Sequence, residues 1–231
     1  MNLLAIDSAS SILSVAVCRE EEIFCEDIKT EMKQSEFVMD IIDNLMKKAA
    51  LKPDDLDGII YMGGPGSFTG LRIGCSIAKG LALSLSRPII AVPTLECISF
   101  NNEEFINTEY KNNSLKLSII QARKNSWFYA FFRNEVRLTN DEEGDFLQLS
   151  DEISKYNEKI LLSGYGAVNL FELLPEILKE KIILIEKTGG YAKELISIAK
   201  KRNLIDNDNT AFLFSGPEYI RKTDAELRNP V

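Results

Sequence analysis

The order of strand-like and helix-like segments predicts an α/β protein whose mixed sheets are covered by helices. The first hundred residues give three short apolar strands joined by tight polar turns, and then helix, strand, helix and strand. A strand meander followed by right-handed crossovers is the pattern of ribonuclease-H-like and actin-like folds. The second half also begins with a hairpin and returns to the same alternation. We therefore expect two actin-like domains of the ASKHA type.

In the first half, short apolar runs indicate strands, and apolar residues with a period near 3.6 indicate helices. Lys52, Pro53 and Asp54 are expected to end the first helix, and a glycine-rich break precedes the second. The predicted strands are residues 3–7, 12–18, 23–25, 56–62 and 88–92, and the predicted helices are residues 35–51 and 71–86.

The polar, asparagine-rich stretch 101–114 is expected to be a linker between domains 1–100 and 115–231. Aromatic residues at 127–132 alternate as in a strand and favour core packing over base stacking. Pro175 is expected to split a helix over residues 167–181, and residues 139–145 are expected to be a solvated acidic loop. The other predicted elements are strands 115–121, 127–133, 159–163 and 182–185 and a closing helix 191–202.

Composition excludes several classes of function. With 35 acidic and 27 basic residues the net charge is −8, and tight nucleic-acid binding needs clustered Lys and Arg. The chain has no histidine, which removes Ser-His-Asp catalysis and histidine-ligated zinc. Its cysteines form no C-x-x-C pair and are expected to be buried thiols. They are Cys18, Cys25, Cys75 and Cys97. No apolar run is long enough to span a membrane and no signal peptide is evident, so we expect a cytoplasmic protein.

The glycine-rich segment 63–74 joins a strand to a helix, where phosphate-binding loops often lie. It lacks the Lys of a P-loop, and Thr69 stands where the third glycine of a dinucleotide fingerprint belongs. Ser67 or Thr69 can cap the following helix. A tight turn with a capped helix and an anion site both remain open from these residues.

As a string, however, GGPGSFTGLRIG resembles the signature of the TsaB (YeaZ) family of bacterial tRNA threonylcarbamoyladenosine biosynthesis proteins. That family is related to the TsaD transferases, which were formerly grouped with glycoproteases. Other strings are similar to the family too, strongly in the first hundred residues and at scattered points afterwards. These are LAIDS from Leu4, SVAV from Ser14, PIIAV from Pro88 and PEYIR from Pro217.

Three departures from the resemblance matter. Gln121 stands where the family usually has Asp in an Asp-Ala-Arg string, so any role of that carboxylate is lost. Gln34 replaces the first residue of a His-Ser pair at the start of the first helix. The transferases carry a pair of metal-binding histidines, and this chain has none. The resemblance therefore implies a non-catalytic relative.

The resemblance implies a scaffold that binds a TsaD-type transferase and supports threonylcarbamoyl transfer to the adenosine beside the tRNA anticodon. A TsaE-type P-loop ATPase joins this complex, tRNA is reached only through it, and the free chain can form a homodimer. No metal or tightly bound cofactor is expected on this chain alone. Ala9 replaces the glycine of an actin-like phosphate loop, so ATP or ADP is expected only at or near the interface. The glycine-loop candidates are Asp7, Ser8, Gly64, Gly66, Ser67, Thr69 and Gly70.

The first two helices have apolar faces wider than one sheet requires. Either both helices are buried in their own domain or they form a docking surface, and the resemblance implies docking of the transferase. Arg72 and Lys79, seven residues apart, lie on roughly one helix face. The interface candidates are Met39, Ile42, Met46, Ala50, Arg72, Cys75, Ala78, Lys79 and Ala82.

Two other functions belong to different classes. A ribonuclease-H-like nuclease would use two metal ions held by Asp7 with Glu36 or Asp40, but the fourth strand offers no further carboxylate. A peptidase, as the old glycoprotease grouping suggests, would need a pair such as Ser76 and Lys79 in place of histidine.

Overall fold

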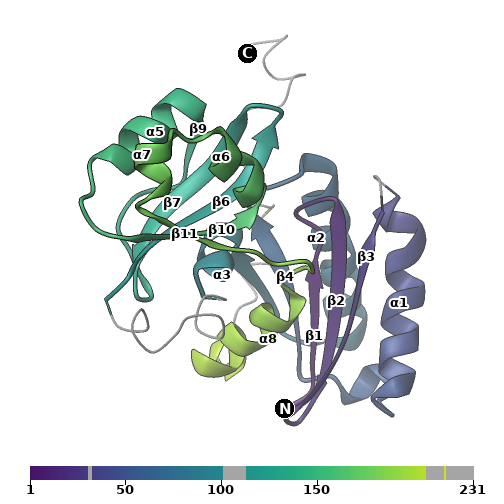
Figure 1. Cartoon of the computed structure of the whole chain (residues 1–231). Coiled ribbons are helices and arrows are strands. Elements are labelled where there is room, and N and C mark those ends of the chain that lie inside the picture. The colour runs from purple at the N-terminus through teal and green to yellow at the C-terminus, as the bar shows by residue number, and fades with distance from the viewer. Residues whose placement is uncertain (31–32, 101–112, 207–215, 217–231) are drawn as a thin grey trace, which may run out of the picture.

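The computed structural model describes residues 1–30, 33–100, 113–206 and 216, which form two sheets with helices (Figure 1). The first sheet has the strand order β3-β2-β1-β4-β5, in which β1 pairs antiparallel with β2 and parallel with β4. This is the predicted meander followed by crossovers. The strands are β1 (Leu3–Asp7), β2 (Ile12–Arg19), β3 (Glu22–Lys29), β4 (Gly58–Gly64) and β5 (Ile89–Pro93).

Alternating side chains of β1 divide the first domain into two layers of core. Leu4 and Ile6 pack with α1 and α2, whereas Leu3 and Ala5 pack with α3 and α8. Because successive side chains of a strand point to opposite faces, an entirely apolar β1 requires helices on both sides of the sheet. The helices are α1 (Gln34–Lys48), α2 (Phe68–Leu85), α3 (Thr94–Phe100) and α8 (Ala192–Lys201), and a 3-10 turn, η1 (Pro53–Asp55), follows α1.

The second sheet repeats the same unit. Its order is β11-β10-β6-β7-β8, with β9 also paired to β7, and β6 pairs antiparallel with β7 and parallel with β10. Helices α5, α6 and α7 cover one face, where Trp127, Tyr129 and Phe131 form the core as expected. The strands are β6 (Leu115–Arg123), β7 (Ser126–Arg133), β8 (Val136–Arg137), β9 (Glu142–Asp145), β10 (Ile160–Tyr165) and β11 (Ile182–Ile185). The helices are α5 (Phe146–Ser154), α6 (Ala167–Leu173) and α7 (Glu176–Lys179).

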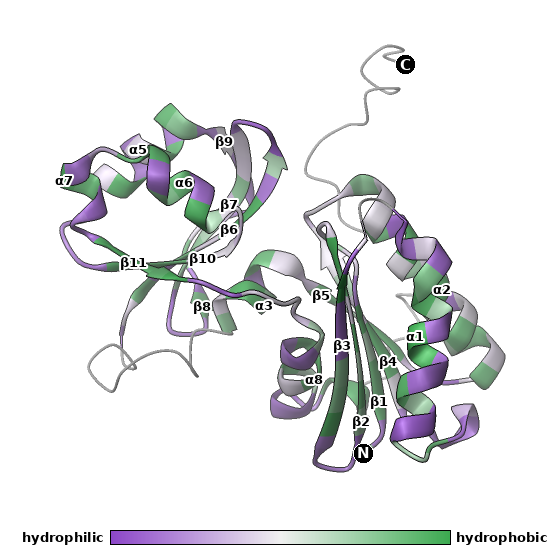
Figure 2. Cartoon of the chain, turned by 45° about the vertical axis from the view of Figure 1, so that its right-hand side comes forward, coloured by the Kyte–Doolittle hydropathy of each residue, from purple (hydrophilic) through white to green (hydrophobic). Residues whose placement is uncertain are grey.

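Helix α8 returns to the first sheet after β11, and a 3-10 turn, η2 (Leu204–Asp206), follows it. Its buried residues share one hydrophobic cluster with Leu3 and Ala5 of the first sheet and with Phe128 and Phe132 of the second. Helices α3 and α8 therefore join the two sheets into a continuous core, and Figure 2 shows α8 beside the first sheet, below the place where the two sheets approach.

The expectation of a solvated acidic loop at residues 139–145 is wrong in its second part. Residues 142–145 form β9, which pairs antiparallel with β7. The Tyr129 hydroxyl donates to the Glu142 carboxylate at 2.9 Å, and the backbone of Gly144 lies close to Tyr129 and Leu149. The carboxylates of Glu142, Glu143 and Asp145 accept hydrogen bonds within the domain while their backbone completes the sheet, so charge alone did not reveal the strand.

Other predictions are confirmed, with small shifts at the ends of elements. Pro175 separates α6 from α7, and β11 has the expected bounds. Helix α3, helix α5 and strand β8 were not expected. Cys18, Cys75 and Cys97 are buried as predicted, but Cys25 is half-buried, and all four thiols are free. Within the part of the chain that the structure describes, no helix has the length and apolar character needed to cross a membrane.

Candidate functional site

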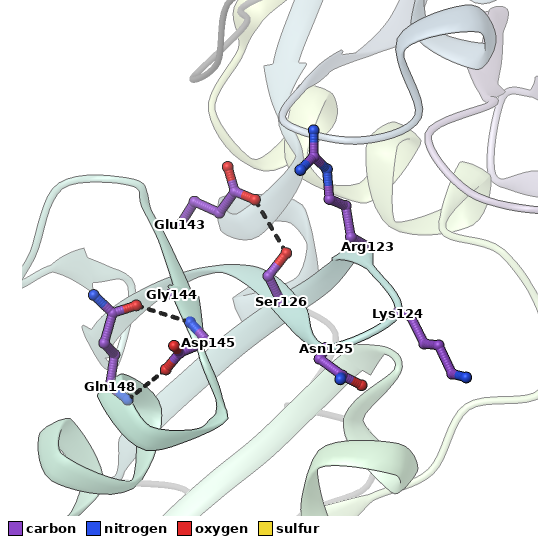
Figure 3. A pocket seen from close by; sticks show the side chains of 8 residues that line it. All are labelled: Arg123, Lys124, Asn125, Ser126, Glu143, Gly144, Asp145 and Gln148. Carbon is purple, nitrogen blue, oxygen red and sulfur yellow. Dashed lines mark hydrogen bonds between the residues drawn. The ribbon is translucent and has the colours of Figure 1, made fainter. Parts of the chain in front are cut away.

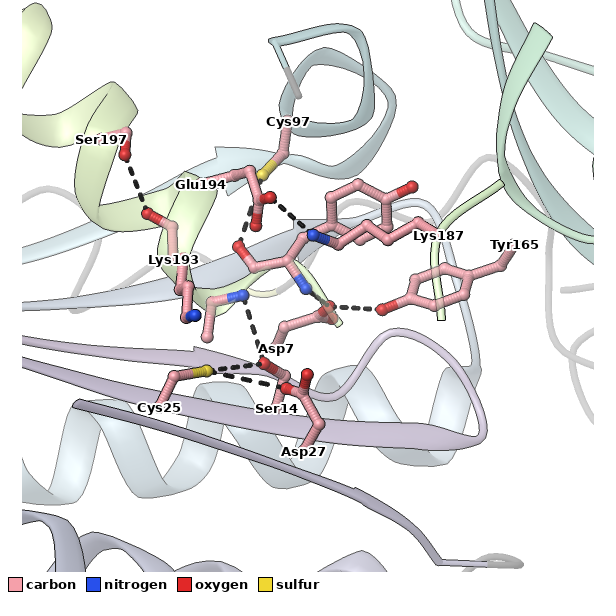
Figure 4. A network of polar contacts seen from close by, with 12 residues as sticks. Asp7, Ser14, Cys25, Asp27, Cys97, Tyr165, Lys187, Lys193, Glu194 and Ser197 are labelled. Atoms are coloured by element: carbon pink, nitrogen blue, oxygen red, sulfur yellow. Dashed lines mark hydrogen bonds and ion pairs between the residues drawn. The ribbon is translucent and has the colours of Figure 1, made fainter. Parts of the chain in front are cut away.

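The carboxylate at the end of β1 is fully buried and already has several hydrogen-bond partners. Asp7 Oδ1 accepts from the backbone N–H of Ala9 at 3.0 Å. Asp7 Oδ2 accepts from the hydroxyl of Tyr165 at 2.7 Å and from the backbone N–H of Tyr191 at 3.0 Å. Burial raises the pKa of the Asp7 carboxyl above its usual 3.8, although these hydrogen bonds act in the opposite direction. Asp7 therefore holds parts of its own chain together (Figure 4).

The residues around Asp7 come from both domains (Figure 4). The ring of Tyr165 meets that of Tyr191 edge to face, with centroids 5.2 Å apart. Lys187 and Glu194 form an ion pair at 2.6 Å, with side chains 18% and 11% exposed. A Cβ at Gly190 would overlap Ser14, so this position between Ser14 and Asp7 requires glycine. The segment from Lys187 to Tyr191 thus covers the end of β1.

The glycine loop packs directly against residues 8–10. The Ser8 hydroxyl donates to the Gly70 carbonyl at 2.8 Å, and the backbone N–H of Ser67 donates to the Ala9 carbonyl at 2.7 Å. A Cβ at Gly70 would overlap the carbonyl oxygen of Ser8, because backbone meets backbone there. Gly66 lies against Ala9 in the same way. These glycines serve a close approach within the chain, which is the turn interpretation left open by the sequence.

The remaining loop candidates begin helix α2 or precede it. Ser67 caps the helix by accepting from the backbone N–H of Gly70 at 3.3 Å, which decides between the two caps, Ser67 and Thr69, that the sequence left open. Thr69 lies exposed in the first turn. Gly64 is buried at the end of β4 with φ of 110°, and its peptide bond to Pro65 is cis. The structure thus brings Ser8 to Gly70 and Ala9 to Ser67, while Thr69 faces solvent.

Gln34 is a functional candidate that sequence reasoning noted only as a departure. It begins α1, is 3% exposed, and donates from Nε2 to the Ser10 carbonyl at 2.6 Å. The sequence showed only a polar amide directly before the predicted helix 35–51, and its burial emerged from the structure. Tyr165 and Tyr191 carried no comparable signal, because they meet Asp7 from 158 and 184 residues away.

The interface candidates divide between core and surface. On the solvent side, Met39 is 48% exposed, Ala50 and Arg72 are also exposed, and Lys79 is half-buried. The structure adds Phe37, 42% exposed, and Leu83, 65% exposed, neither of which was singled out before. The candidates that pack in the core beneath α1 and α2 are Ile42, Met46, Cys75, Ala78 and Ala82. These five residues do not belong to the predicted docking surface, because their side chains pack in the core of their own domain.

The carboxylates proposed for a nuclease do not meet. Glu36 and Asp40 lie exposed on α1, whereas Asp7 is fully buried at the end of β1. Among the residues that the structure describes, no group of three or more His, Cys, Asp or Glu is placed to hold a metal ion. Ser76, proposed for a peptidase, lies exposed on α2.

A hollow of about 500 Å³ lies in the second domain, at the turn between β6 and β7. Several of its polar groups already pair with one another: Ser126 donates to Glu143 at 3.0 Å, and Asp145 and Gln148 cap α5 reciprocally. Figure 3 shows Arg123 and Lys124 extending from the turn. The hollow is lined by Arg123, Lys124, Asn125, Ser126, Glu143, Gly144, Asp145 and Gln148.

Comparisons with known proteins give a consistent result. Residues 29–227 match the family model for TsaD, tRNA N6-adenosine threonylcarbamoyltransferase. The chain is 30% identical to the tRNA threonylcarbamoyladenosine biosynthesis protein TsaB of Escherichia coli, covering 100% of this chain and 99% of that protein. It is 28% identical to TsaB of Bacillus subtilis, covering 99% and 97%. The solved structure of YeaZ from Pseudomonas aeruginosa shares the fold, with a TM-score of 0.73 at 20% identity, covering 95% and 99%.

Proposed function

The chain belongs to the TsaB family, whose members are named for tRNA threonylcarbamoyladenosine biosynthesis. We propose that it is a non-catalytic subunit in that pathway. In this role it binds a TsaD-type transferase and supports transfer of the threonylcarbamoyl group to the adenosine beside the anticodon. Its likeness to the transferase family over residues 29–227 supports pairing between two related folds.

The observation that carries the non-catalytic role is the closed end of β1. Both oxygens of Asp7 accept hydrogen bonds from the chain itself, and the residue is 0% exposed. A catalytic carboxylate must come within hydrogen-bond reach of the reacting group. Here Tyr165 and Tyr191 take the positions a substrate would need, so the chemistry falls to the partner.

The same geometry supports the expectation that the chain alone binds nucleotide only weakly. A phosphate cradle needs backbone N–H groups that are open to the ligand. In this loop the N–H of Ser67 is taken by the Ala9 carbonyl, and Gly70 lies against Ser8. We therefore assign ATP or ADP to the assembled interface, which a TsaE-type ATPase would share.

The α1–α2 surface is our candidate for docking. It consists of the exposed residues Phe37, Met39, Ala50, Arg72 and Leu83 with the half-buried Lys79. Exposed aromatic side chains, methionine and arginine are enriched at protein interfaces. The same surface would support self-pairing of the free chain. Since the net charge is −8, we assign tRNA contact to the complex, which works where tRNA is, in the cytoplasm.

A reconstitution with one component left out tests the function. The transferase, the ATPase, the carbamoyl-adenylate-forming enzyme, threonine, bicarbonate, ATP and tRNA are combined with and without this chain. Modified nucleoside is measured by mass spectrometry, and we expect product only when the chain is present. Equal product without it would refute the role and return attention to nuclease and peptidase assays.

The docking surface is tested by a matched pair of substitutions. Leu83→Glu places a charge on α2, and Ile177→Glu places one on α7, where the side chain is 71% exposed against 65% for Leu83. We expect Leu83→Glu to weaken transferase binding by about tenfold or more, while Ile177→Glu binds like the unmodified chain. Equal effects of the two substitutions would show that docking uses another surface.

A further inference from the structure

The loop that follows β1 is the place where the second domain meets the starts of both docking helices. On one side, Asp7 Oδ2 accepts from the hydroxyl of Tyr165, the last residue of β10 in the second sheet. This hydrogen bond joins residues 158 positions apart. A hydrogen bond in the low-dielectric interior is electrostatically stronger than the same bond in water.

On the other side, the next three residues hold the two helices. Ser8 donates to the carbonyl of Gly70, Ala9 accepts from Ser67, and Ser10 accepts from Gln34. Gln34 is the first residue of α1, and Ser67 is the N-cap of α2. Residues 8 and 9 are buried, so the loop has little room to shift without moving these helix starts.

We propose that the hydrogen bond between Tyr165 and Asp7 positions the starts of α1 and α2, so that the second domain sets how well the α1–α2 surface fits the transferase. The inference rests on the proposed docking function. Tyr165 acts through Asp7 and the loop, and it is therefore a positioning residue.

The surroundings of Tyr165 allow its hydroxyl to be removed while its ring stays in place. Its ring is held edge to face by Tyr191, which is 1% exposed. Burial raises the pKa of Tyr165 well above its usual value, so its hydroxyl remains a donor. Replacement by Phe keeps the ring contact and removes the hydroxyl, which donates to Asp7 and also bonds with the side chain of Ser10 in the same loop. Asp7 Oδ2 then retains the backbone N–H of Tyr191 alone.

The test compares Tyr165→Phe with Tyr129→Phe. Tyr129 also donates to a carboxylate, that of Glu142 at 2.9 Å, but within the second domain. Two quantities are measured: affinity for the transferase, and amide hydrogen exchange in the free chain at residues 34–38 and 67–71. We expect Tyr165→Phe to weaken binding by about tenfold and to speed exchange at both helix starts. Tyr129→Phe should change neither.

A double-variant cycle tests the route itself. Ser8→Ala removes the hydroxyl that reaches Gly70 while leaving Tyr165 and Asp7 in place. If the loop carries the coupling, Ser8→Ala weakens binding too, and the double variant loses less than the two single losses combined. Strictly additive losses would overturn the route through the loop.

The outcomes separate this inference from the proposed function. If the unmodified chain does not bind the transferase, the docking function fails, and exchange in the free chain still decides whether Tyr165 positions the helices. If the chain binds but Tyr165→Phe matches Tyr129→Phe in affinity and exchange, the positioning role is wrong and docking stands.

Discussion

The two halves of the chain use the same strand order but treat the end of the first strand in opposite ways. In the first half, β1 ends at Asp7, which is 0% exposed and accepts hydrogen bonds from Ala9 in its own loop and from two distant segments. In the second half, the corresponding strand β6 ends near Gln121, which is half-buried and donates to the carbonyl of Lys124 in its own hairpin turn at 3.3 Å.

This difference shows how one supersecondary unit serves two purposes. The loop after β1 is covered by the glycine loop, by Tyr165 and by the start of α8, so it fixes the arrangement of distant elements. The turn after β6 is exposed at Arg123, Lys124 and Asn125 and borders an open hollow. A buried loop carries structural coupling, whereas an exposed turn tolerates change.

The largest expected effect on stability comes from a substitution in the glycine loop that packs against the buried loop after β1. Gly70→Ala would push a methyl group into the Ser8 backbone, and we expect it to lower the free energy of unfolding by about 3 kcal/mol. The control is Gly80→Ala in the same helix, where nothing lies within 4 Å, and it should raise that free energy by up to about 1 kcal/mol. Urea unfolding of both variants measures this. A loss below about 1 kcal/mol for Gly70→Ala would mean that the loop can yield.

The next substitution compares the two strand ends directly. Asp7→Asn cannot accept from all three donors, because its amide nitrogen is itself a donor. We expect a loss of about 1–3 kcal/mol in the free energy of unfolding. Gln121→Ala should change it by about 0.5 kcal/mol or less. Similar losses at the two positions, measured by thermal and urea unfolding, would contradict the contrast between the halves.

A smaller effect compares the helix caps. In the second half, Asp145 and Gln148 form a reciprocal capping box on α5, with bonds of 3.0 and 2.9 Å. In the first half, Ser67 caps α2 through one bond of 3.3 Å. We expect Asp145→Ala to lower the free energy of unfolding by about 1 kcal/mol and Ser67→Ala by about 0.5 kcal/mol. The reverse order in urea unfolding would show that the loop contacts of Ser67 outweigh its cap.

The smallest effect is a difference in pH dependence. Because burial raises the pKa of Asp7, its folded form binds a proton more readily than its unfolded form. The Asp7 contribution to stability is therefore largest below pH 3.8, the ordinary pKa of the group, and it declines as the pH rises through the raised pKa of the folded form. Glu158 behaves oppositely: its bond to Arg133 lowers its pKa, and its contribution is lost on acidification. Because Glu158 is exposed, its contribution to the free energy of unfolding is small.

The pH effect is measured as the free energy of unfolding between pH 7 and pH 4. Relative to Asp7→Asn, the unmodified chain should gain stability on acidification; relative to Glu158→Gln, it should lose a little. A loss relative to Asp7→Asn would mean that the hydrogen bonds to Asp7 outweigh its burial.

Local patterns predicted most elements but not every one of their roles. The helix expected at 35–51 is α1 at Gln34–Lys48, and Pro175 split its helix as expected, because period and proline geometry act within a few residues. Strand β9 was missed because its reason for forming is a partner strand, β7, rather than its own acidic sequence. Likewise, nothing near residues 192–201 indicates that α8 packs on the first sheet.

The sequence by itself determined the fold class and the family, and it narrowed the cap of α2 to Ser67 or Thr69, since these depend on neighbours in the chain or on a specific string of residues. Only the tertiary structure decided that Asp7 is occupied by Tyr165 and Tyr191, that Gly70 meets Ser8, and that five interface candidates lie in the core. Those outcomes depend on which distant segments share a sheet edge or a core. Burial and hydrogen bonding arise from contacts between segments that are distant in the sequence, and a local sequence pattern does not specify those contacts.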